Sequence, residues 1–230
     1  SPWINWPVGA DRTFLKSPTA LNEILKSTSM NKARRFLSGA DHRRIEKSFA
    51  NAGLPKKWWK AFGRELRHCA RCGERLSWRL VRAEGQRRFV CGGCRWIFYQ
   101  NPKIVAAALP VWKNKIVLLR RAIEPAKGLW SHPAGFMELG ETVQDAAIRE
   151  TREEIGCRVR LAGPARLYSY DDAAVVTVVY DAWVVGAGPR AGAESLEVKA
   201  FAADEIPWDR LAFRSTYHAL RDWADRRSKS

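Results

Sequence analysis

The chain has 230 residues, of which 46% are hydrophobic and 28% are charged. This apolar content is enough for a folded core and excludes a wholly disordered chain. No apolar run approaches the roughly 18 residues of a membrane-spanning helix, so we expect no membrane partner. The formal charge of +16 favours a polyanionic partner such as RNA or a ribonucleoprotein. The alternative is a soluble protein whose surface is merely basic.

The positive charge is concentrated in the first hundred residues. Residues 1–68 carry 14 Lys and Arg against 5 Asp and Glu, residues 69–100 carry 7 against 2, and residues 101–230 carry 19 against 17. We interpret these ranges as a basic, Trp-containing helical extension, a cysteine module and an α/β domain. A first residue other than Met is compatible with a removed transit peptide, so we expect an organelle matrix (mitochondrion or plastid) or otherwise the cytoplasm.

The extension ends in a basic amphipathic segment in which lysines flank two adjacent tryptophans. The residues in question are Lys56, Lys57, Trp58, Trp59 and Lys60. A helix of this kind could contact RNA or a partner protein, with bases stacking on the tryptophans. We favour the alternative that the tryptophans pack on the chain's own domain, because aromatic residues at helical spacing more often belong to a core.

Four cysteines form two CxxC pairs separated by eighteen residues. Cys69 and Cys72 form the first pair, and Cys91 and Cys94 form the second. Two such pairs supply four thiolates for a tetrahedral Zn²⁺ site with no open position, so we predict a structural zinc ribbon over residues 69–100. The alternatives are a redox pair or two disulfides. A lone redox dithiol needs no second matched pair, and the odd fifth cysteine does not suit a disulfide framework.

After residue 101 the pattern changes to strands separated by turns. Residues 103–112 and 115–121 are β-branched runs joined by a short polar turn, which predicts a hairpin. We expect further strands over 158–170, 174–185 and 196–202, and a closing helix over 213–227. Strands of mixed connection, together with a mid-chain helix and a terminal helix, predict an α/β sandwich with a mixed sheet.

The mid-chain helix carries the strongest chemical signal. Glu150, Glu153 and Glu154 fall within an arc of about 100°, so their carboxylates project from one helix face. We expect Ile148 and Ile155 on the opposite side, facing the core. Residues 135–157 contain six acidic side chains and two arginines, and such a cluster is unfavourable unless a cation occupies it. All-oxygen ligands suit Mg²⁺ or Mn²⁺, and the alternative is an ordinary acidic surface helix.

This stretch resembles the signature of the Nudix hydrolase family. The charged and glycine positions that match are Gly135, Glu141, Arg149, Glu150, Glu153, Glu154 and Gly156. Thr151 and Cys157 stand where the signature has apolar residues, a mild departure that affects packing. The resemblance implies an αβα sandwich that cleaves a phosphoanhydride in a nucleoside diphosphate linked to another moiety.

The resemblance also implies roles for individual side chains. Glu150, Glu153 and Glu154 are the expected Mg²⁺ or Mn²⁺ ligands, and Glu141 is a further or water-mediated ligand. Arg149 is expected to orient a carboxylate. The general base comes either from the helix itself or from a later loop, where Glu194 and Glu197 follow a Gly/Ala-rich stretch.

A second resemblance, over residues 69–215, is to the ribbon-bearing Nudix enzymes of bacteria and plastids. It rests on the cysteine pairs and on residues 99–103, 120–125, 128–138 and 205–208. That branch includes pyrophosphatases of ADP-ribose and FAD. The related NADH pyrophosphatases carry a Ser-Gln-Pro-Trp-Pro-Phe-Pro segment that is absent at residues 165–172, which argues against NADH or NAD-capped RNA. The alternatives are a 5′-end RNA pyrophosphohydrolase and a subunit of an organellar ribonucleoprotein, docked through residues 1–100.

Overall fold

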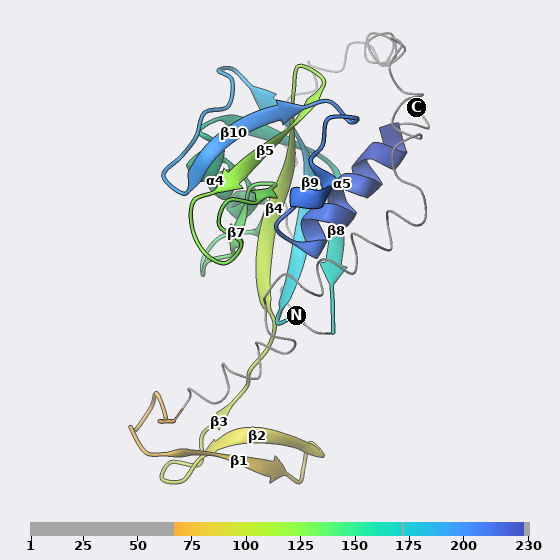
Figure 1. Cartoon of the computed structure of the whole chain (residues 1–230). Helices are drawn as coiled ribbons and strands as arrows, with labels where there is room; N and C mark the ends of the chain where they lie inside the picture. Colours follow the sequence, from red (N-terminus) through yellow and green to blue (C-terminus); the bar gives the residue numbers. More distant parts are fainter. Residues whose placement is uncertain (1–66, 172, 228–230) are drawn as a thin grey trace, which may run out of the picture.

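A computed structural model describes residues 67–171 and 173–227 (Figure 1). Nearly all of the predicted basic extension therefore lies outside the described residues, including Lys56, Lys57, Trp58, Trp59 and Lys60. None of the helices in the described ranges is long and apolar enough to cross a membrane.

The zinc-ribbon region is a small antiparallel sheet with the order β1-β2-β3. The strands are β1 (Leu76–Val81), β2 (Gln86–Cys91) and β3 (Ile97–Phe98). Figure 1 shows this sheet set apart from the rest of the described chain, to which it is joined by the segment that leads into β4. The two CxxC pairs lie just before β1 and at the end of β2, so the hairpin brings them together.

The main domain is built on a mixed sheet of seven strands. The central order is β10-β5-β4-β9-β8, with β6 paired to β5 and β7 paired to β4. The bounds are β4 (Lys103–Trp112), β5 (Lys115–Arg121), β6 (Trp130–Ser131), β7 (Ala134–Phe136), β8 (Arg158–Ser169), β9 (Val175–Val185) and β10 (Ser195–Phe201). Strands β4 and β9 are parallel and the other pairs are antiparallel, which confirms the predicted mixed sheet.

The predicted hairpin is present between β4 and β5. Val111 pairs with Ile116, and the turn residues Lys113 and Asn114 both have positive φ, at 48° and 64°. Two successive residues of positive φ are the mark of a type I′ turn, whose twist matches that of the flanking strands.

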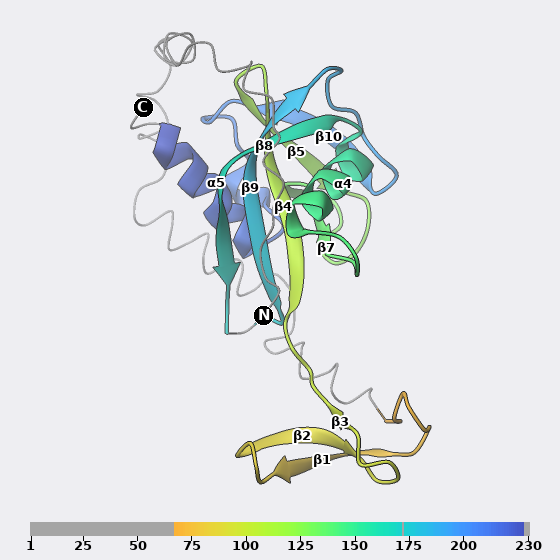
Figure 2. The same cartoon turned by 180° about the vertical axis from the view of Figure 1, so that it is seen from behind.

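Two helices cover the opposite faces of the sheet: α4 (Val143–Ile155) and α5 (Arg214–Arg227), as Figures 1 and 2 show. A short 3₁₀ turn, η2 (Trp208–Arg210), precedes α5. Side chains of β4 alternate between the faces: Leu109 joins the cluster around α5, and Ala108 joins the cluster around Ile155 of α4. The predicted terminal helix is present, and the following side chains on its inner face are buried: Tyr217, Leu220 and Trp223.

Helix α4 has sequence-encoded ends. The Thr142 hydroxyl accepts a hydrogen bond from the Asp145 N–H while the Asp145 carboxylate caps the Thr142 N–H, and the helix ends at Gly156 in the left-handed region. Its inner face is formed by Ala146, Ala147, Thr151, Glu154 and Ile155.

The prediction for Ile148 was wrong. Ile155 is fully buried, but Ile148 is 37% exposed. The two isoleucines are two turns apart, and only the C-terminal end of α4 is covered by a loop whose Arg190 N–H bonds the Ile155 carbonyl. Ile148 instead borders an open surface pocket.

Candidate functional site

The side chains of Glu154 and Glu150 project from α4 toward strand β7. The Glu154 side chain is only 6% exposed, and its Oε2 accepts a hydrogen bond of 2.8 Å from the Ala134 N–H. Glu150 lies against Gly135, where a Cβ would come 2.1 Å from the Glu150 Cδ. The observed position of the Glu150 carboxylate therefore requires glycine at position 135.

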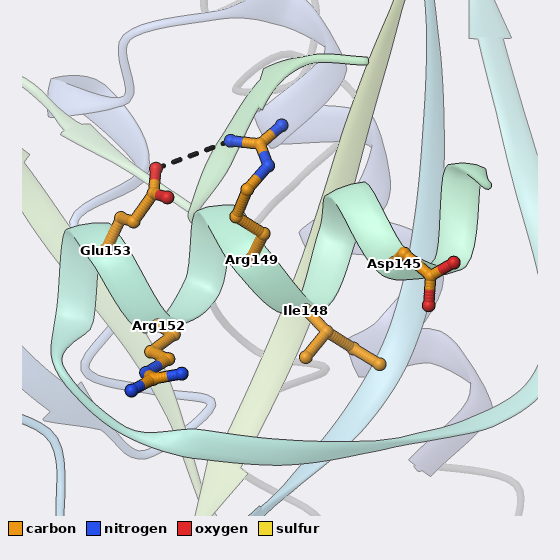
Figure 3. Close-up of a pocket in the computed structure, with 5 residues that line it drawn as sticks. All are labelled: Asp145, Ile148, Arg149, Arg152 and Glu153. Atoms are coloured by element: carbon orange, nitrogen blue, oxygen red, sulfur yellow. Dashed lines mark hydrogen bonds and ion pairs between the residues drawn. The ribbon is translucent and has the colours of Figure 1, made fainter. Parts of the chain in front are cut away.

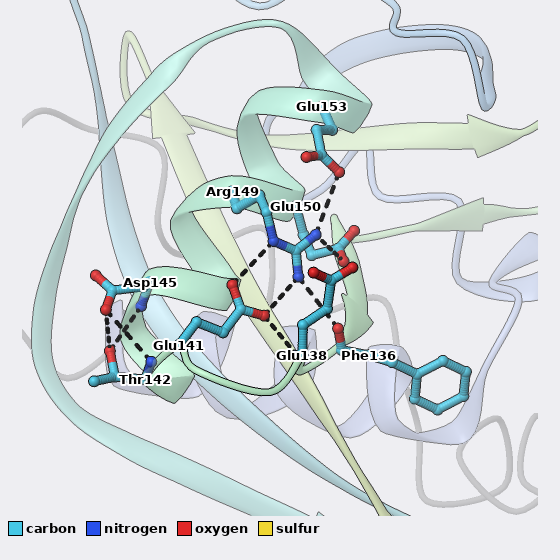
Figure 4. A network of polar contacts seen from close by, with 8 residues as sticks. All are labelled: Phe136, Glu138, Glu141, Thr142, Asp145, Arg149, Glu150 and Glu153. Carbon is cyan, nitrogen blue, oxygen red and sulfur yellow. Dashed lines mark hydrogen bonds and ion pairs between the residues drawn. The ribbon is translucent and has the colours of Figure 1, made fainter.

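Arg149 connects the carboxylates of the predicted site (Figure 4). It makes a two-pronged contact with Glu141, from Nε to Oε2 at 3.0 Å and from Nη2 to Oε1 at 2.7 Å. Its Nη1 donates to Glu150 Oε1 at 2.7 Å and to Glu153 Oε2 at 3.3 Å, and its Nη2 also donates to the Phe136 carbonyl. Arg149 therefore contacts three of the predicted carboxylates, and its orienting role in catalysis stays a prediction.

The hydrogen bonds leave different numbers of oxygens free for a cation. Glu141 uses both oxygens on Arg149, and Oε1 also accepts the Glu138 N–H. Within the described residues, Glu150 Oε2, Glu153 Oε1 and Glu154 Oε1 accept no hydrogen bond. The three helix glutamates can therefore offer one oxygen each to a divalent cation, whereas Glu141 anchors Arg149 and suits a water-mediated contact better.

The acidities of these groups differ in a way that fits a cation site. Burial, and the charges of Glu150 and Glu194, raise the pKa of Glu154 to about 8, against the opposing Ala134 hydrogen bond and the charge of Arg121. Burial and the neighbouring carboxylates also raise the pKa of Glu150. The hydrogen bonds from Arg149 and from the Glu138 N–H lower the pKa of Glu141 to about 2. Carboxylates with raised pKa in one cleft are the groups that a bound cation would stabilise in their charged form.

The Gly/Ala-rich stretch before β10 caps the C-terminal end of α4. The Gly192 N–H and the Ser195 hydroxyl both donate to the Glu154 carbonyl, at 3.0 and 2.7 Å. A Cβ on Gly192 would lie 1.9 Å from the Glu153 carbonyl oxygen. This stretch therefore holds the backbone that carries the acidic residues. The sequence analysis did not select Gly192 or Ser195, and no local pattern marks them.

The structure separates the two candidates for a general base. Glu194 contributes to the raised pKa of both Glu150 and Glu154, so its charge acts on the acidic cluster. Glu197 instead forms an ion pair of 3.4 Å with Arg120 on the neighbouring strand β5. Glu194 also stands between Gly192 and Ser195, which both bond the Glu154 carbonyl. These observations favour Glu194 over Glu197, and the role of a general base stays a prediction.

Arg121 is a cation near the acidic cluster that the sequence analysis did not single out. Its charge acts on Glu154, and burial lowers its own pKa. Its Nε donates to the Pro125 carbonyl at 2.9 Å, and in the described part of the chain its two Nη groups donate no hydrogen bond. They are available to an anion.

An open pocket lies along the outer side of α4 (Figure 3). Its volume is about 490 Å³, and it is lined by Asp145, Ile148, Arg149, Arg152 and Glu153. Arg149 and Glu153 belong to both the pocket and the acidic network, so the exposed edge of the site opens to solvent here.

The four predicted metal ligands of the ribbon come together. The sulfur atoms of Cys69, Cys72, Cys91 and Cys94 all lie within 4.8 Å of one another, and none of the five cysteines forms a disulfide. The Arg71 and Cys94 N–H groups donate to Cys69 and Cys91 sulfur, each at 3.4 Å. This donor set suits a tetrahedral metal ion and excludes two disulfides in this structure.

Comparison with known families agrees with both sites. The family profile described as NUDIX domain matches residues 102–222, and the profile described as Nudix N-terminal matches residues 67–100. The chain belongs to the Nudix family. Together with its relatives below, this makes the protein a Nudix hydrolase, a hydrolase of phosphoanhydrides, on a Nudix fold preceded by a zinc ribbon.

Several characterised Nudix proteins are similar to this one. The ADP-ribose pyrophosphatase of Methanocaldococcus jannaschii is 29% identical over 145 residues, which is 61% of this chain and 80% of its own. The NAD-capped RNA hydrolase NudC of Pseudomonas fluorescens is 31% identical over 128 residues, which is 55% of this chain but only 42% of its own. A crystal structure of a NUDIX hydrolase from Nitrosomonas europaea has a TM-score of 0.68 at 36% identity and covers 71% of this chain and 93% of its own.

Proposed function

We propose that this Nudix hydrolase is a Mg²⁺- or Mn²⁺-dependent pyrophosphatase of ADP-ribose, FAD or a similar dinucleotide. The observation that carries the proposal is the network in which Arg149 binds Glu150 and Glu153 and leaves one oxygen of each free, next to the buried Glu154 on the same helix. The similarity to an ADP-ribose pyrophosphatase over 80% of that protein supports the substrate class.

In this proposal each side chain has a separate task. Arg149 holds Glu141, Glu150 and Glu153 in place, so their carboxylates need no reorganisation when substrate binds. A divalent cation held by the three helix glutamates would supply charge neutralisation at the pyrophosphate and a lowered pKa of an attacking water. Arg121 offers its free Nη groups to a phosphate oxygen.

The overall reaction is a hydrolysis. Water attacks one phosphorus of the anhydride, the bond from that phosphorus to the bridging oxygen breaks, and two phosphate monoesters leave, one of them a nucleoside monophosphate. In this proposal Glu194 takes the proton of the attacking water; its charge is one of those that raise the pKa of Glu150 and of Glu154. The ribbon would bind Zn²⁺ in a structural role, because four cysteine sulfurs leave no open coordination position.

A substrate panel with Mg²⁺ or Mn²⁺ tests the proposal. We expect release of AMP from ADP-ribose or FAD, and a loss of about a hundredfold or more in kcat for Glu153→Gln and for Glu154→Gln. Glu205→Gln, which removes a carboxylate paired with Lys115 elsewhere on the surface, is the matched control and should keep full activity. Glu194→Gln should lower kcat and Glu197→Gln should not. Absence of metal-dependent turnover on the whole panel would contradict the proposal.

NAD-capped RNA is the second candidate substrate. It is favoured by the similarity to NudC proteins, although the chain spans less than half the length of those relatives. Including a NAD-capped oligonucleotide in the same panel decides between the two: hydrolysis of that oligonucleotide at a higher kcat/KM than ADP-ribose and FAD would establish the RNA substrate. A role as a docking subunit of a ribonucleoprotein would instead be favoured by a panel with no turnover.

A further inference from the structure

The hairpin of the zinc ribbon has an exposed aromatic face. Pairing of β1 with β2 places Trp78 opposite Phe89 and Leu80 opposite Arg87, and directly paired residues share a face of the sheet. Trp78 is 51% exposed and Leu80 is 55% exposed, and the Trp78 ring contacts Phe89 with centroids 4.8 Å apart. We call this surface the Trp78 face; it consists of Trp78, Leu80, Arg87 and Phe89.

The Trp78 face lies in a strongly basic surrounding. Residues 67–100 contain eight arginines and no lysine, against two glutamates. One of those glutamates, Glu84, is already engaged by Arg88 and by the Tyr99 hydroxyl. Four thiolates around a divalent ion add a formal charge of about −2, which still leaves the ribbon positive.

One pair of arginines lies on the other face of the hairpin, opposite the Trp78 face. Arg79 lies directly opposite Arg88 across the two strands, and like charges in directly opposite positions destabilise a sheet. Arg88 is compensated by Glu84, at 3.1 Å. Arg79 is exposed, and the hydrogen bond that it donates goes to the neutral Ser77 hydroxyl at 2.6 Å. Arg79 therefore adds to the positive charge of the ribbon without belonging to the Trp78 face.

We propose that the Trp78 face binds single-stranded nucleic acid. A base would stack on the exposed Trp78 ring, while phosphates contact Arg87 on the same face. Stacking with an aromatic side chain and phosphate contacts with arginine are the two interactions that single-stranded binding surfaces combine. An apolar protein partner would leave the arginines unmatched, and an acidic one would leave Trp78 and Leu80 without apolar contact. The positive charge of the ribbon and the exposed Trp78 ring together therefore favour a nucleic acid over either kind of protein partner.

This binding surface is separate from the proposed reaction. Figure 1 shows the ribbon sheet away from α4 and β7, which carry the acidic cluster. Binding to the Trp78 face therefore requires no turnover, and it can be measured in a protein that hydrolyses nothing. Failure of the substrate panel and failure of this binding experiment are independent results.

The experiment measures binding of a fluorescein-labelled oligouridine to the full zinc-loaded chain by fluorescence anisotropy. Trp78→Leu keeps apolar bulk but removes the ring, and we expect binding to weaken about tenfold, while Trp78→Phe keeps most of it. Arg87→Gln should weaken binding and reduce the slope of log affinity against log salt by about one. Arg160→Gln removes the same charge from an exposed position of β8 and is the matched control, expected to bind like wild type.

Zinc content of each variant shows that the ribbon is intact. Wild-type affinity in both Trp78→Leu and Arg87→Gln would overturn the proposal. An effect of Arg87→Gln equal to that of Arg160→Gln, with none from Trp78→Leu, would also overturn it, because binding would then depend on overall charge alone. Competition by polyglutamate as strong as competition by unlabelled oligouridine of equal charge would assign the surface to an acidic protein instead.

Discussion

Gly135 lies directly against the carboxyl group of Glu150, so that a Cβ on Gly135 would come 2.1 Å from the Glu150 Cδ. The clash is with the end of a flexible side chain, so Gly135→Ala should displace the carboxylate and leave the fold in place. We expect a Tm within a few degrees of wild type and a fall of about tenfold or more in kcat/KM for the nucleotide substrate.

The control for that experiment is Gly92→Ala in the ribbon. Its Cβ would meet the nearest atom, the Arg75 carbonyl oxygen, at an ordinary 3.6 Å, so both Tm and activity should be unchanged. Unchanged activity in Gly135→Ala would show that Glu150 does not need its observed position.

Gly192→Ala, unlike Gly135→Ala, should strongly reduce the stability of the fold. Its Cβ would lie 1.9 Å from the Glu153 carbonyl oxygen, which belongs to the helix backbone and cannot rotate away. We expect a loss of about 1–3 kcal/mol in the free energy of unfolding, measured by urea denaturation. Ala193→Ser changes an exposed neighbour in the same stretch and should cost little. Equal stabilities of the two variants would contradict the tight capping of α4.

The ribbon should contain about one zinc ion per chain in freshly isolated, reduced protein. Cys72→Ser should lose the metal and destabilise the ribbon, because a structural site without its fourth sulfur no longer contributes its binding energy to folding. Cys157→Ser is the control: this thiol is buried in the main domain with Ile155 and Val159, so the variant should retain zinc. Elemental analysis of the three proteins checks this, and wild-type protein without zinc would refute it.

His132 should make the stability depend on pH. The ring is buried, both ring nitrogens lack a hydrogen-bond partner within the described residues, and burial lowers its pKa to about 4. Since the unfolded value is near 6.5, the unfolded chain binds more protons between these pH values. Stability contributed through this group therefore falls as the pH drops from about 6.5 to about 4, by roughly 1.4 kcal/mol per pH unit inside that window.

The comparison of wild type with His132→Leu isolates this contribution, because both proteins share the other titrating groups. Leucine buries no unsatisfied nitrogen, so the variant should be at least as stable near neutral pH and increasingly more stable than wild type as the pH falls. Free energies of unfolding from urea denaturation at several pH values measure the difference. Parallel curves for the two proteins would contradict the account.

Local patterns were sufficient to predict the elements and to select candidate residues for both sites. The hairpin of β4 and β5 follows from two β-branched runs around a short turn, and the common face of Glu150, Glu153 and Glu154 follows from the helical period alone. The metal site of the ribbon follows from the spacing of its cysteine pairs. The hairpin and the helix glutamates are formed by residues close together in the sequence. The cysteine pairs are further apart, but four thiolates in two such pairs suit a tetrahedral site.

The other residues at the candidate site depend on long-range contacts that no local pattern encodes. Gly192 and Ser195 reach Glu154 from about 40 residues away, and Glu194 was distinguishable from Glu197 only because β10 pairs the latter with Arg120. Ile148 and Ile155 share a helix face by periodicity, yet Arg190 and its loop cover only the second one. Helical and strand periods specify which side chains share a face; the order of the strands in the sheet decides which of those faces is covered, and by what.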